Sequence, residues 1–266
     1  MMVRVAAGLI GLAVVLPALF LGGPVAVWVI VAFALLVSID EYARMAFPES
    51  LRGHLLWMGF GVACVWAGVA FRPAVLPVLL PLVLVGTMGF VTLRPGERLD
   101  DAADRVSRMV LGIAWVSLIT VLIPLRDLPQ GEWWVFLALA VSWMGDTGAY
   151  FAGRFFGRAK LHPLVSPKKT WAGFWGGIAS SALGVLLLRE VVFTDLSLLD
   201  AVVLGGVGSA MGVLGDLSES LLKRAFGVKD SGWIMPGHGG LLDRIDSVLF
   251  VAPFIYGYLV VIKGMV

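Results

Sequence analysis

The residues best able to do chemistry lie near the C-terminal end, in the stretch SESLLKRAFGVKDSGWIMPGHGGLLDRID that begins at Ser218. It gathers charged and titratable side chains in an otherwise mostly apolar chain: Lys223, Arg224, Lys229, Asp230, His238, Asp243, Arg244 and Asp246. A charge at the centre of a bilayer costs at least ~2.5–3.5 kcal/mol, so apolar chains place charges sparingly. The density of charge therefore indicates a candidate site at a membrane surface.

The carboxylates of this region come in pairs whose spacing suits a cation. Asp216 and Glu219 stand three residues apart, and so do Asp243 and Asp246, so each pair shares one face of a helix. Like charges on one face repel unless a positive group lies between them, and carboxylate oxygens suit a hard cation such as Mg²⁺. The simpler alternative is static ion pairing of these acids with the nearby arginines Arg154, Arg224 or Arg244.

A second group of polar residues reads Ser166-Pro167-Lys168-Lys169-Thr170-Trp171. Two adjacent ammonium groups beside hydroxyl groups suit a polyphosphate, because they combine neutralising charge with hydrogen-bond donors. The alternative is a basic membrane anchor with an interfacial tryptophan, which many membrane proteins carry. The acids expected at the same depth favour the phosphate interpretation.

His238 stands in a run of small or stiff residues, Pro-Gly-His-Gly-Gly. Such a backbone can approach a ligand closely. The imidazole could donate to a phosphate oxygen or transfer a proton, because its ordinary pKa lies near neutrality. A turn with an interfacial histidine is an equally simple interpretation.

Composition places these groups in a membrane protein. The 266 residues are 59% hydrophobic and 14% charged, with a mean hydropathy of +0.95 and a net charge of +2. A soluble domain normally carries about 25% charged residues. Ordinary globular burial cannot hide this much apolar surface, so lipid must cover part of it.

Runs without charge predict an all-α polytopic membrane protein with about nine transmembrane helices, because a span needs about 20 mainly apolar residues. The predicted spans are residues 5–22, 24–39, 53–71, 73–93, 109–125, 133–152, 170–188, 199–219 and 246–262. A β-barrel would show alternating polarity, which these runs lack. We expect residues 1–130 to form an N-terminal set of about five spans, and residues 131–266 to form the catalytic region.

The basic residues predict the orientation. With nine spans, sixteen of the 20 Lys and Arg residues fall on the side of the N-terminus; the other four are Arg72, Arg126, Arg189 and Lys263. Cytoplasmic loops are enriched in basic residues, so the N-terminus is expected in the cytoplasm. Asp146 then joins the four acids near Asp216 and Asp243 at the depth of the cytoplasmic headgroups.

The motifs from Ser220 to Asp246 resemble the family of phosphatidate cytidylyltransferases, in the pattern S-x-x-K-R-x₄-K-D-x-G-x₂-M-P-G-H-G-G-x₂-D-R-x-D. The upstream elements SPKKTW and Asp146…Tyr150…Gly153-Arg154…Gly157 are similar to that family too. Two positions depart from it: Met235 replaces a different apolar residue, and Ala172 stands where the family usually has glutamate.

The resemblance implies transfer of CMP from CTP to phosphatidate, giving CDP-diacylglycerol and pyrophosphate in phospholipid biosynthesis. It implies Asp216, Asp243 and Asp246 as ligands of Mg²⁺, with His238 beside them in catalysis. It implies substrate-binding roles for the residues Asp146, Ser166, Lys168, Lys169, Thr170, Lys223, Arg224, Lys229 and Arg244. A second cation such as K⁺, a homodimer, contact with membrane lipid, no nucleic-acid partner, and a bacterial inner membrane with the active site facing the cytoplasm are also expected.

Two other functions stay open at this point. A CTP-dependent lipid kinase of the polyprenol type would direct the attack at the γ-phosphorus and release CDP. An ion-coupled transporter would use its acids as ion relays. Transporters typically show inverted repeats or broken helices at the bilayer midplane, whereas the charges of this chain gather at one surface.

The orientation can be tested by labelling single cysteines in intact cells on a Cys64→Ser background, since Cys64 is the one natural cysteine. We expect an impermeant thiol reagent to label Lys263→Cys and to spare Lys229→Cys, because the basic bias places position 229 inside. The reverse pattern would overturn the orientation and the access of a cytoplasmic nucleotide.

Overall fold

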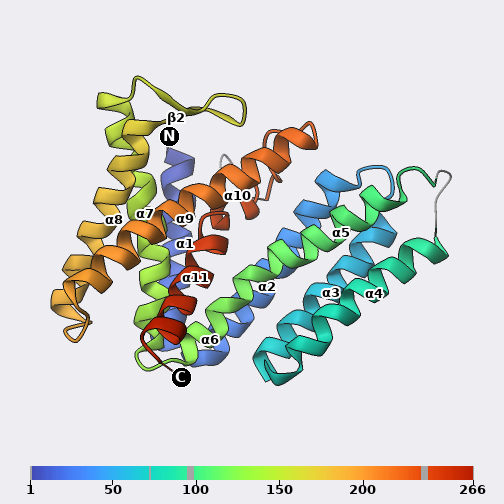
Figure 1. Ribbon diagram of the computed structural model, residues 1–266, viewed down its shortest axis with the longest axis horizontal. Helices are drawn as coiled ribbons and strands as arrows, with labels where there is room; N and C mark the ends of the chain where they lie inside the picture. Colours follow the sequence, from blue (N-terminus) through green and yellow to red (C-terminus); the bar gives the residue numbers. More distant parts are fainter. Residues whose placement is uncertain (1, 72, 95–98, 235–238, 266) are drawn as a thin grey trace. The chain divides into compact units, whose positions relative to one another are not determined.

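A computed structural model describes residues 2–71, 73–94, 99–234 and 239–265, and most of them are helical (Figure 1). The α-helices are α1 (Met2–Leu21), α2 (Gly23–Ala46), α3 (Leu51–Phe71), α4 (Leu76–Leu93), α5 (Ala102–Ser117), α6 (Leu122–Asp127), α7 (Gly131–Phe156), α8 (Trp171–Val191), α9 (Leu198–Ala225), α10 (Leu242–Ile245) and α11 (Val248–Gly257). Shorter elements are η1 (Pro73–Val75), η2 (Leu118–Val121), η3 (Tyr258–Ile262), β1 (Lys160–His162) and β2 (Ser166–Thr170).

Seven helical segments of the described chain are long and apolar enough to cross a membrane, so the predicted class, an all-α polytopic membrane protein, agrees with the structure. They are Gly23–Ala46, Leu51–Phe71, Pro73–Leu93, Ala102–Asp127, Gly131–Phe156, Trp171–Val191 and Leu198–Ala225. The other two predicted spans correspond to shorter apolar helices, Gly11–Leu21 and Val248–Ile262. The count of nine and the orientation stay predictions.

The chain divides into two compact units, and neither is continuous in sequence. Unit 1 comprises Met1–Pro124 and Asp230–Leu242, and unit 2 comprises Leu125–Lys229 and Asp243–Val266. The chain therefore passes from unit 2 to unit 1 after Lys229, contributes Asp230–Leu242 to unit 1, and belongs to unit 2 again from Asp243. The predicted regions 1–130 and 131–266 stay a description of the sequence alone.

Unit 1 is built on α2, α3 and α5, which pack against one another (Figure 1). Tyr42 is fully buried, and its hydroxyl donates to the carbonyl oxygen of Arg108 at 2.9 Å. A Cβ atom at Gly112 of α5 would lie 2.3 Å from the Tyr42 ring and 2.5 Å from the Met58 side chain. Gly112 is therefore needed for α5 to pack against the tyrosine.

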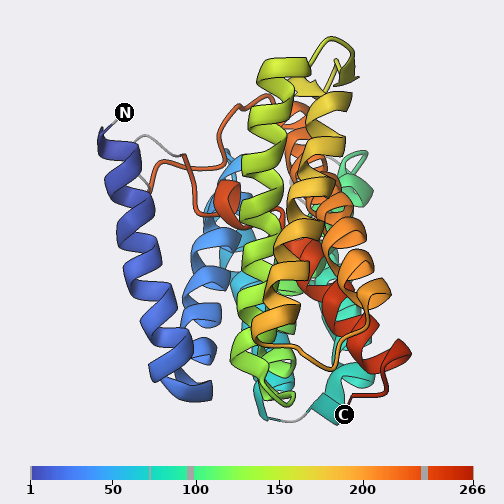
Figure 2. The ribbon, with the colours of Figure 1, turned by 90° about the vertical axis from the view of Figure 1, so that its left-hand side faces the viewer.

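Unit 2 is built on α7, α8 and α9, which lie side by side in Figures 1 and 2. Small residues line their contacts. The Ser181 hydroxyl of α8 donates to the Val141 carbonyl oxygen of α7 at 2.9 Å. A Cβ atom at Gly148 would lie 2.6 Å from the Gly176 carbonyl oxygen, and one at Gly205 would lie 2.8 Å from that of Ser181. Helices approach this closely only where side chains are small.

An antiparallel hairpin of β1 and β2 precedes α8, an element that the helical pattern of the sequence did not predict. Lys160 pairs with Thr170, and His162 pairs with Ser166. The hairpin ends at the N-cap of α8, where the Thr170 hydroxyl accepts from the Gly173 amide at 3.1 Å. This cap satisfies one of the free amides at the start of the helix, which fixes the end of β2 to α8.

Two adjacent glycines of α9 test this packing. A Cβ atom at Gly205 would lie 2.6 Å from the Ala182 Cα atom, whereas one at Gly206 would make an ordinary contact at 3.7 Å. We expect Gly205→Ala to lower the free energy of unfolding by about 1–3 kcal/mol through overpacking. The matched Gly206→Ala should be neutral or stabilising by up to ~1 kcal/mol, because alanine favours helix. Thermal unfolding of both purified variants in detergent measures the difference; equal melting temperatures would contradict it.

Candidate active site

The Lys223 ammonium group joins two carboxylates inside unit 2. Its Nζ atom donates to Glu219 Oε2 at 3.0 Å, one helical turn earlier on α9, and also to Asp243 of α10. The three side chains are 11%, 1% and 6% exposed in the order Lys223, Glu219 and Asp243. Two acids thus share one cation away from water, where removal of the cation would leave both charges uncompensated.

A second group of carboxylates lies beside this one. Asp146 of α7 and Asp216 of α9 interact electrostatically, and Asp246, which follows α10, interacts with both. The Lys169 ammonium group of β2 contacts Asp216 Oδ2 at 2.6 Å, and the Ser220 hydroxyl lies 3.4 Å from Asp216 Oδ1. Four elements thus bring acids and a lysine to one place in unit 2.

Close packing of the backbone brings Asp246 to α9. A Cβ atom at Gly215 would lie 2.4 Å from the Asp246 carbonyl oxygen, so any larger residue would push the two segments apart. Asp246 Oδ1 accepts from the Ser247 amide at 2.6 Å, and α11 begins one residue later, at Val248. This local bond places Asp246 in a turn rather than in the predicted span 246–262.

A small polar cavity of about 10 Å³ adjoins Asp146, with room for about one water molecule. Its lining comes from α7, from α9 and from the residue before α11: Val141, Ser142, Gly145, Asp146, Ser209, Gly212, Val213 and Ser247. The buried Ser209 hydroxyl has no hydrogen-bond partner within the described part of the chain. The cavity is polar enough to be hydrated, and it is too small for a substrate.

The donor set suits Mg²⁺ only in combination with a phosphate ligand. Among the residues that the structure describes, no three His, Cys, Asp or Glu side chains are grouped closely enough to hold a metal ion. Lysine ammonium groups contact Asp216 and Asp243 instead. Mg²⁺ commonly takes one or two carboxylates and completes its coordination with water and substrate phosphates, so carboxylates that repel one another here fit that ion.

The adjacent lysines of the SPKKT segment have different surroundings. Successive residues of a strand point to opposite faces, so Lys168 and Lys169 diverge on β2. Lys168 is exposed, whereas Lys169 is partly buried on Asp216. Ser166 is also partly buried, and the Thr170 hydroxyl caps α8. Lys169 is therefore the member of this motif that the structure brings to the carboxylates.

The remaining predicted residues that the structure describes are exposed. Arg244 is exposed and interacts electrostatically with Asp146. Arg224 is exposed, and its guanidinium group lies 3.4 Å from the Val228 carbonyl oxygen. Lys229 is exposed beyond the end of α9. His238 lies outside the described residues.

Glu219, which the sequence paired with Asp216 but to which the family resemblance assigned no role, belongs to the cluster through its contact with Lys223. Its spacing of four from Lys223 was the available signal, because Glu and Lys at i and i+4 meet on one helix face. Its Oε1 atom is buried and has no hydrogen-bond partner among residues 99–234 or the other described ranges. The Glu219 carboxylate also interacts electrostatically with Asp246 and Asp243, so it connects the two groups of acids.

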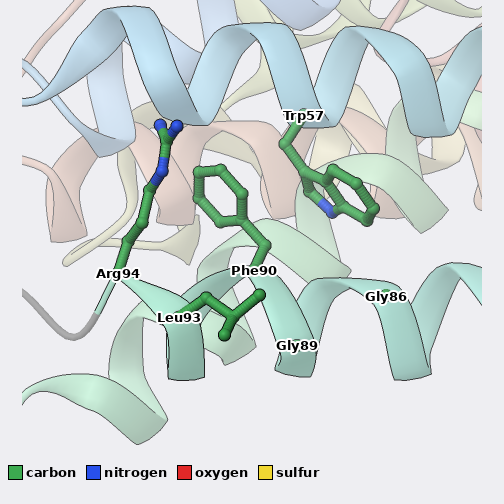
Figure 3. A pocket seen from close by; sticks show the side chains of 6 residues that line it. All are labelled: Trp57, Gly86, Gly89, Phe90, Leu93 and Arg94. Atoms are coloured by element: carbon green, nitrogen blue, oxygen red, sulfur yellow. The ribbon is translucent and has the colours of Figure 1, made fainter.

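A larger cavity, about 400 Å³, lies in unit 1 between α3 and α4 (Figure 3). Trp57 of α3 stacks on Phe90 of α4 with ring centroids 5.6 Å apart, and the Arg94 guanidinium group lies over the Phe90 ring at 5.5 Å. The remaining lining is Gly86, Gly89 and Leu93. None of the predicted site residues that the structure describes lines this apolar cavity.

Comparison with known proteins adds independent information. The sequence pattern of the Cytidylyltransferase family matches residues 2–262. Three relatives are named phosphatidate cytidylyltransferase: from Staphylococcus epidermidis (47% identical over 126 residues, 47% of this chain and 48% of the relative), Bacillus subtilis (42% over 155 residues, 58% of each) and Staphylococcus aureus strain COL (45% over 128 residues, 47% and 48%). The matched residues thus span about half the length of these relatives.

Proposed function

Because the chain belongs to the Cytidylyltransferase family, we propose that it transfers CMP from CTP to phosphatidate, giving CDP-diacylglycerol and pyrophosphate. The relatives named phosphatidate cytidylyltransferase support this choice of substrates. The structural observation that carries the proposal is the cluster of alternating carboxylates and ammonium groups formed by Asp216, Lys169, Glu219, Lys223 and Asp243.

Such a cluster suits a reaction between two phosphates. Phosphoryl transfer leaves the protein little covalent work beyond holding the reactants in line and offsetting their charge. Lys169 and Lys223 are partly or fully shielded from water, where an ammonium group attracts a phosphate oxygen more strongly than at an exposed surface. Each is now held by a carboxylate, which keeps it in place without a substrate.

In the proposed reaction, an oxygen of the phosphatidate phosphate forms a bond to the α-phosphorus of CTP. The bond from that phosphorus to the bridging oxygen breaks, and pyrophosphate leaves. Lys169 and Lys223 bind the phosphate oxygens, and the exposed Lys168, Arg224, Lys229 and Arg244 add positive charge around them. Ser166, Thr170 and Asp146 complete the proposed substrate-binding set, with His238 as a donor to phosphate or in proton transfer.

Asp216, Asp243 and Asp246 are the residues proposed to hold Mg²⁺. When bound there, the ion would supply positive charge that offsets the negative charge of the reacting phosphates. The chain's own acids would orient the triphosphate by this means, while Lys223 stays between Glu219 and Asp243. A second cation such as K⁺ and a homodimer stay predictions from the family resemblance.

The proposed location is a bacterial inner membrane, with the cluster at the cytoplasmic face. The seven apolar helical segments support a membrane location. The bacterial relatives support the proposal that this membrane is bacterial. In this orientation CTP arrives from the cytoplasm while the phosphate of phosphatidate stays at headgroup depth. The basic asymmetry of the loops is the argument for the cytoplasmic side.

One assay tests the function. Purified protein is incubated with Mg²⁺, phosphatidate, and CTP labelled either in the α-phosphate or in the γ-phosphate. The proposal expects the α-label in a lipid product and the γ-label in pyrophosphate. The γ-label in a lipid together with free CDP, with a polyprenol as acceptor, would identify a lipid kinase instead. No transfer to any lipid, with cation flux in proteoliposomes, would identify a transporter.

The proposed metal ligands make a specific prediction. We expect Asp243→Asn and Asp246→Asn each to lower kcat by about 100-fold or more, because charge stabilisation at the reacting phosphates is commonly of this size. Both variants keep the shape of the side chain, and Lys223 keeps Glu219 as its partner in Asp243→Asn, so protein levels in the membrane should stay normal. Asp195→Asn, an exposed aspartate in the α8–α9 connection, serves as the control. Wild-type kcat in either site variant at ordinary Mg²⁺ would refute the assignment.

The two lysines of β2 make a second prediction. Lys169→Ala should raise the KM for CTP by about tenfold or more, because a nucleoside triphosphate carries about four charges and Mg²⁺ offsets only two. Lys168→Ala should act in the same direction but less, since Lys168 is exposed and points away from Asp216. Lys168→Arg should retain more activity than alanine.

The exposed Lys160 of β1 provides the matched control, as Lys160→Ala removes the same charge from the same hairpin. The KM values for CTP and for phosphatidate are measured separately in each variant. An unchanged KM for CTP in Lys168→Ala and Lys169→Ala, at normal membrane levels, would return both lysines to an anchoring role.

A further inference from the structure

Unit 1 contains a buried carboxylate that the proposed reaction does not use, Glu41 of α2. It is 4% exposed, in a helix that is otherwise mostly apolar. Its neighbour Asp40 is more exposed and pairs with Arg44 at 2.7 Å, as surface residues four apart commonly do. A buried carboxylate is costly unless strong donors surround it, so the partners of Glu41 define its role.

The donors come from a segment that lies about 200 positions later in the sequence. The Leu241 amide donates to Glu41 Oε1 at 2.9 Å, and the Leu242 amide donates to Glu41 Oε2 at 2.8 Å. The hydroxyl of the buried Ser231 lies 3.4 Å from Oε2. One carboxylate therefore holds both ends of the segment Ser231–Leu242. Hydrogen bonds to an ionised acceptor are about twice as strong as those between neutral groups.

Glycines let the backbone reach this carboxylate. A Cβ atom at Gly232 would lie 2.5 Å from Glu41 Oε1, and one at Gly240 would lie 2.5 Å from Oε2 and 2.2 Å from the Ser231 hydroxyl oxygen. Gly239 has φ +83°, a conformation that side chains rarely permit. Gly232 and Gly240 thus lie directly against the Glu41 carboxylate, where larger residues would not fit.

We propose that Glu41 is a positioning residue that fixes the backbone amides immediately before Asp243. It touches no proposed substrate atom; it acts through the amide of Leu242, and the next residue is Asp243, one of the proposed metal ligands. Leu242 begins the single turn of α10, so a fixed amide there fixes the start of the turn that carries Asp243. The expected effect of Glu41 on kcat rests on the proposed function. The fixing of the Leu241 and Leu242 amides by Glu41 does not depend on that function.

Hydrogen exchange of the full chain in detergent tests the contact directly. In Glu41→Gln the side chain keeps its size, but its amide nitrogen cannot accept a hydrogen bond, so at least one backbone amide loses its partner. Exchange in a peptide covering residues 239–245 should become at least about tenfold faster. Peptides from α7 and α8 should be unchanged. Glu49→Gln, at an exposed position after α2, is the matched control and should exchange like the wild type.

The activity arm distinguishes positioning from folding. In Glu41→Gln we expect kcat for the cytidylyl transfer to fall at least about tenfold while the KM for CTP changes less than about threefold. Gly240→Ala disturbs the same contact with Glu41 without changing the carboxylate, because the added Cβ atom collides with Glu41 and Ser231. It should show the same faster exchange and the same loss of kcat.

Wild-type exchange in residues 239–245 of Glu41→Gln would overturn the proposal, and so would wild-type kcat with faster exchange. Loss of both variants from the membrane would overturn it too, because Glu41 would then be required for folding of unit 1 as a whole. If the wild type transfers no CMP while the exchange differs as expected, the proposed function fails and the anchoring of the segment stands.

Discussion

The candidate site depends on one ammonium group placed between two buried acids. Lys223 contacts Glu219 on its own helix and Asp243 on α10, so it joins two elements as well as two charges. Breaking a buried pair by removing one partner costs about 3–5 kcal/mol, because the remaining charge stays in a poor solvent. The same argument applies in milder form to Lys169 and Asp216, which are each more exposed.

Such charge contacts require backbones that approach closely, and small residues supply that approach. Gly215 lets α9 lie against the backbone of Asp246, and glycines and serines bring α8 and α9 together elsewhere in unit 2. In unit 1, Gly232 and Gly240 do the same for the segment that surrounds Glu41. The buried carboxylates Glu41 and Asp243 are therefore compensated by contacts with other parts of the chain rather than by water.

Much of the fold was predictable because its main signal is local. Charge-free runs of about 20 residues predicted helices, and seven of the nine predicted spans correspond to long apolar helical segments. The hairpin of β1 and β2 was missed, because its eight strand residues, which include Lys160 and the SPKKT run, have no clear periodicity. The sequence did not indicate that Asp230–Leu242 belongs to unit 1, because it does so through contacts with distant residues such as Glu41.

The sequence by itself determined the family, the membrane character, and the charged residues among which the site had to be sought; the match over residues 2–262 confirms the family. Only the tertiary structure decided which charge meets which. Lys168 is exposed whereas Lys169 contacts Asp216. Lys223 contacts both Glu219 and Asp243, and Glu41 accepts a hydrogen bond from the Leu242 amide. The reason is physical: pairing between elements depends on helix rotation and on how closely small residues let backbones approach, and the pattern of one segment carries neither.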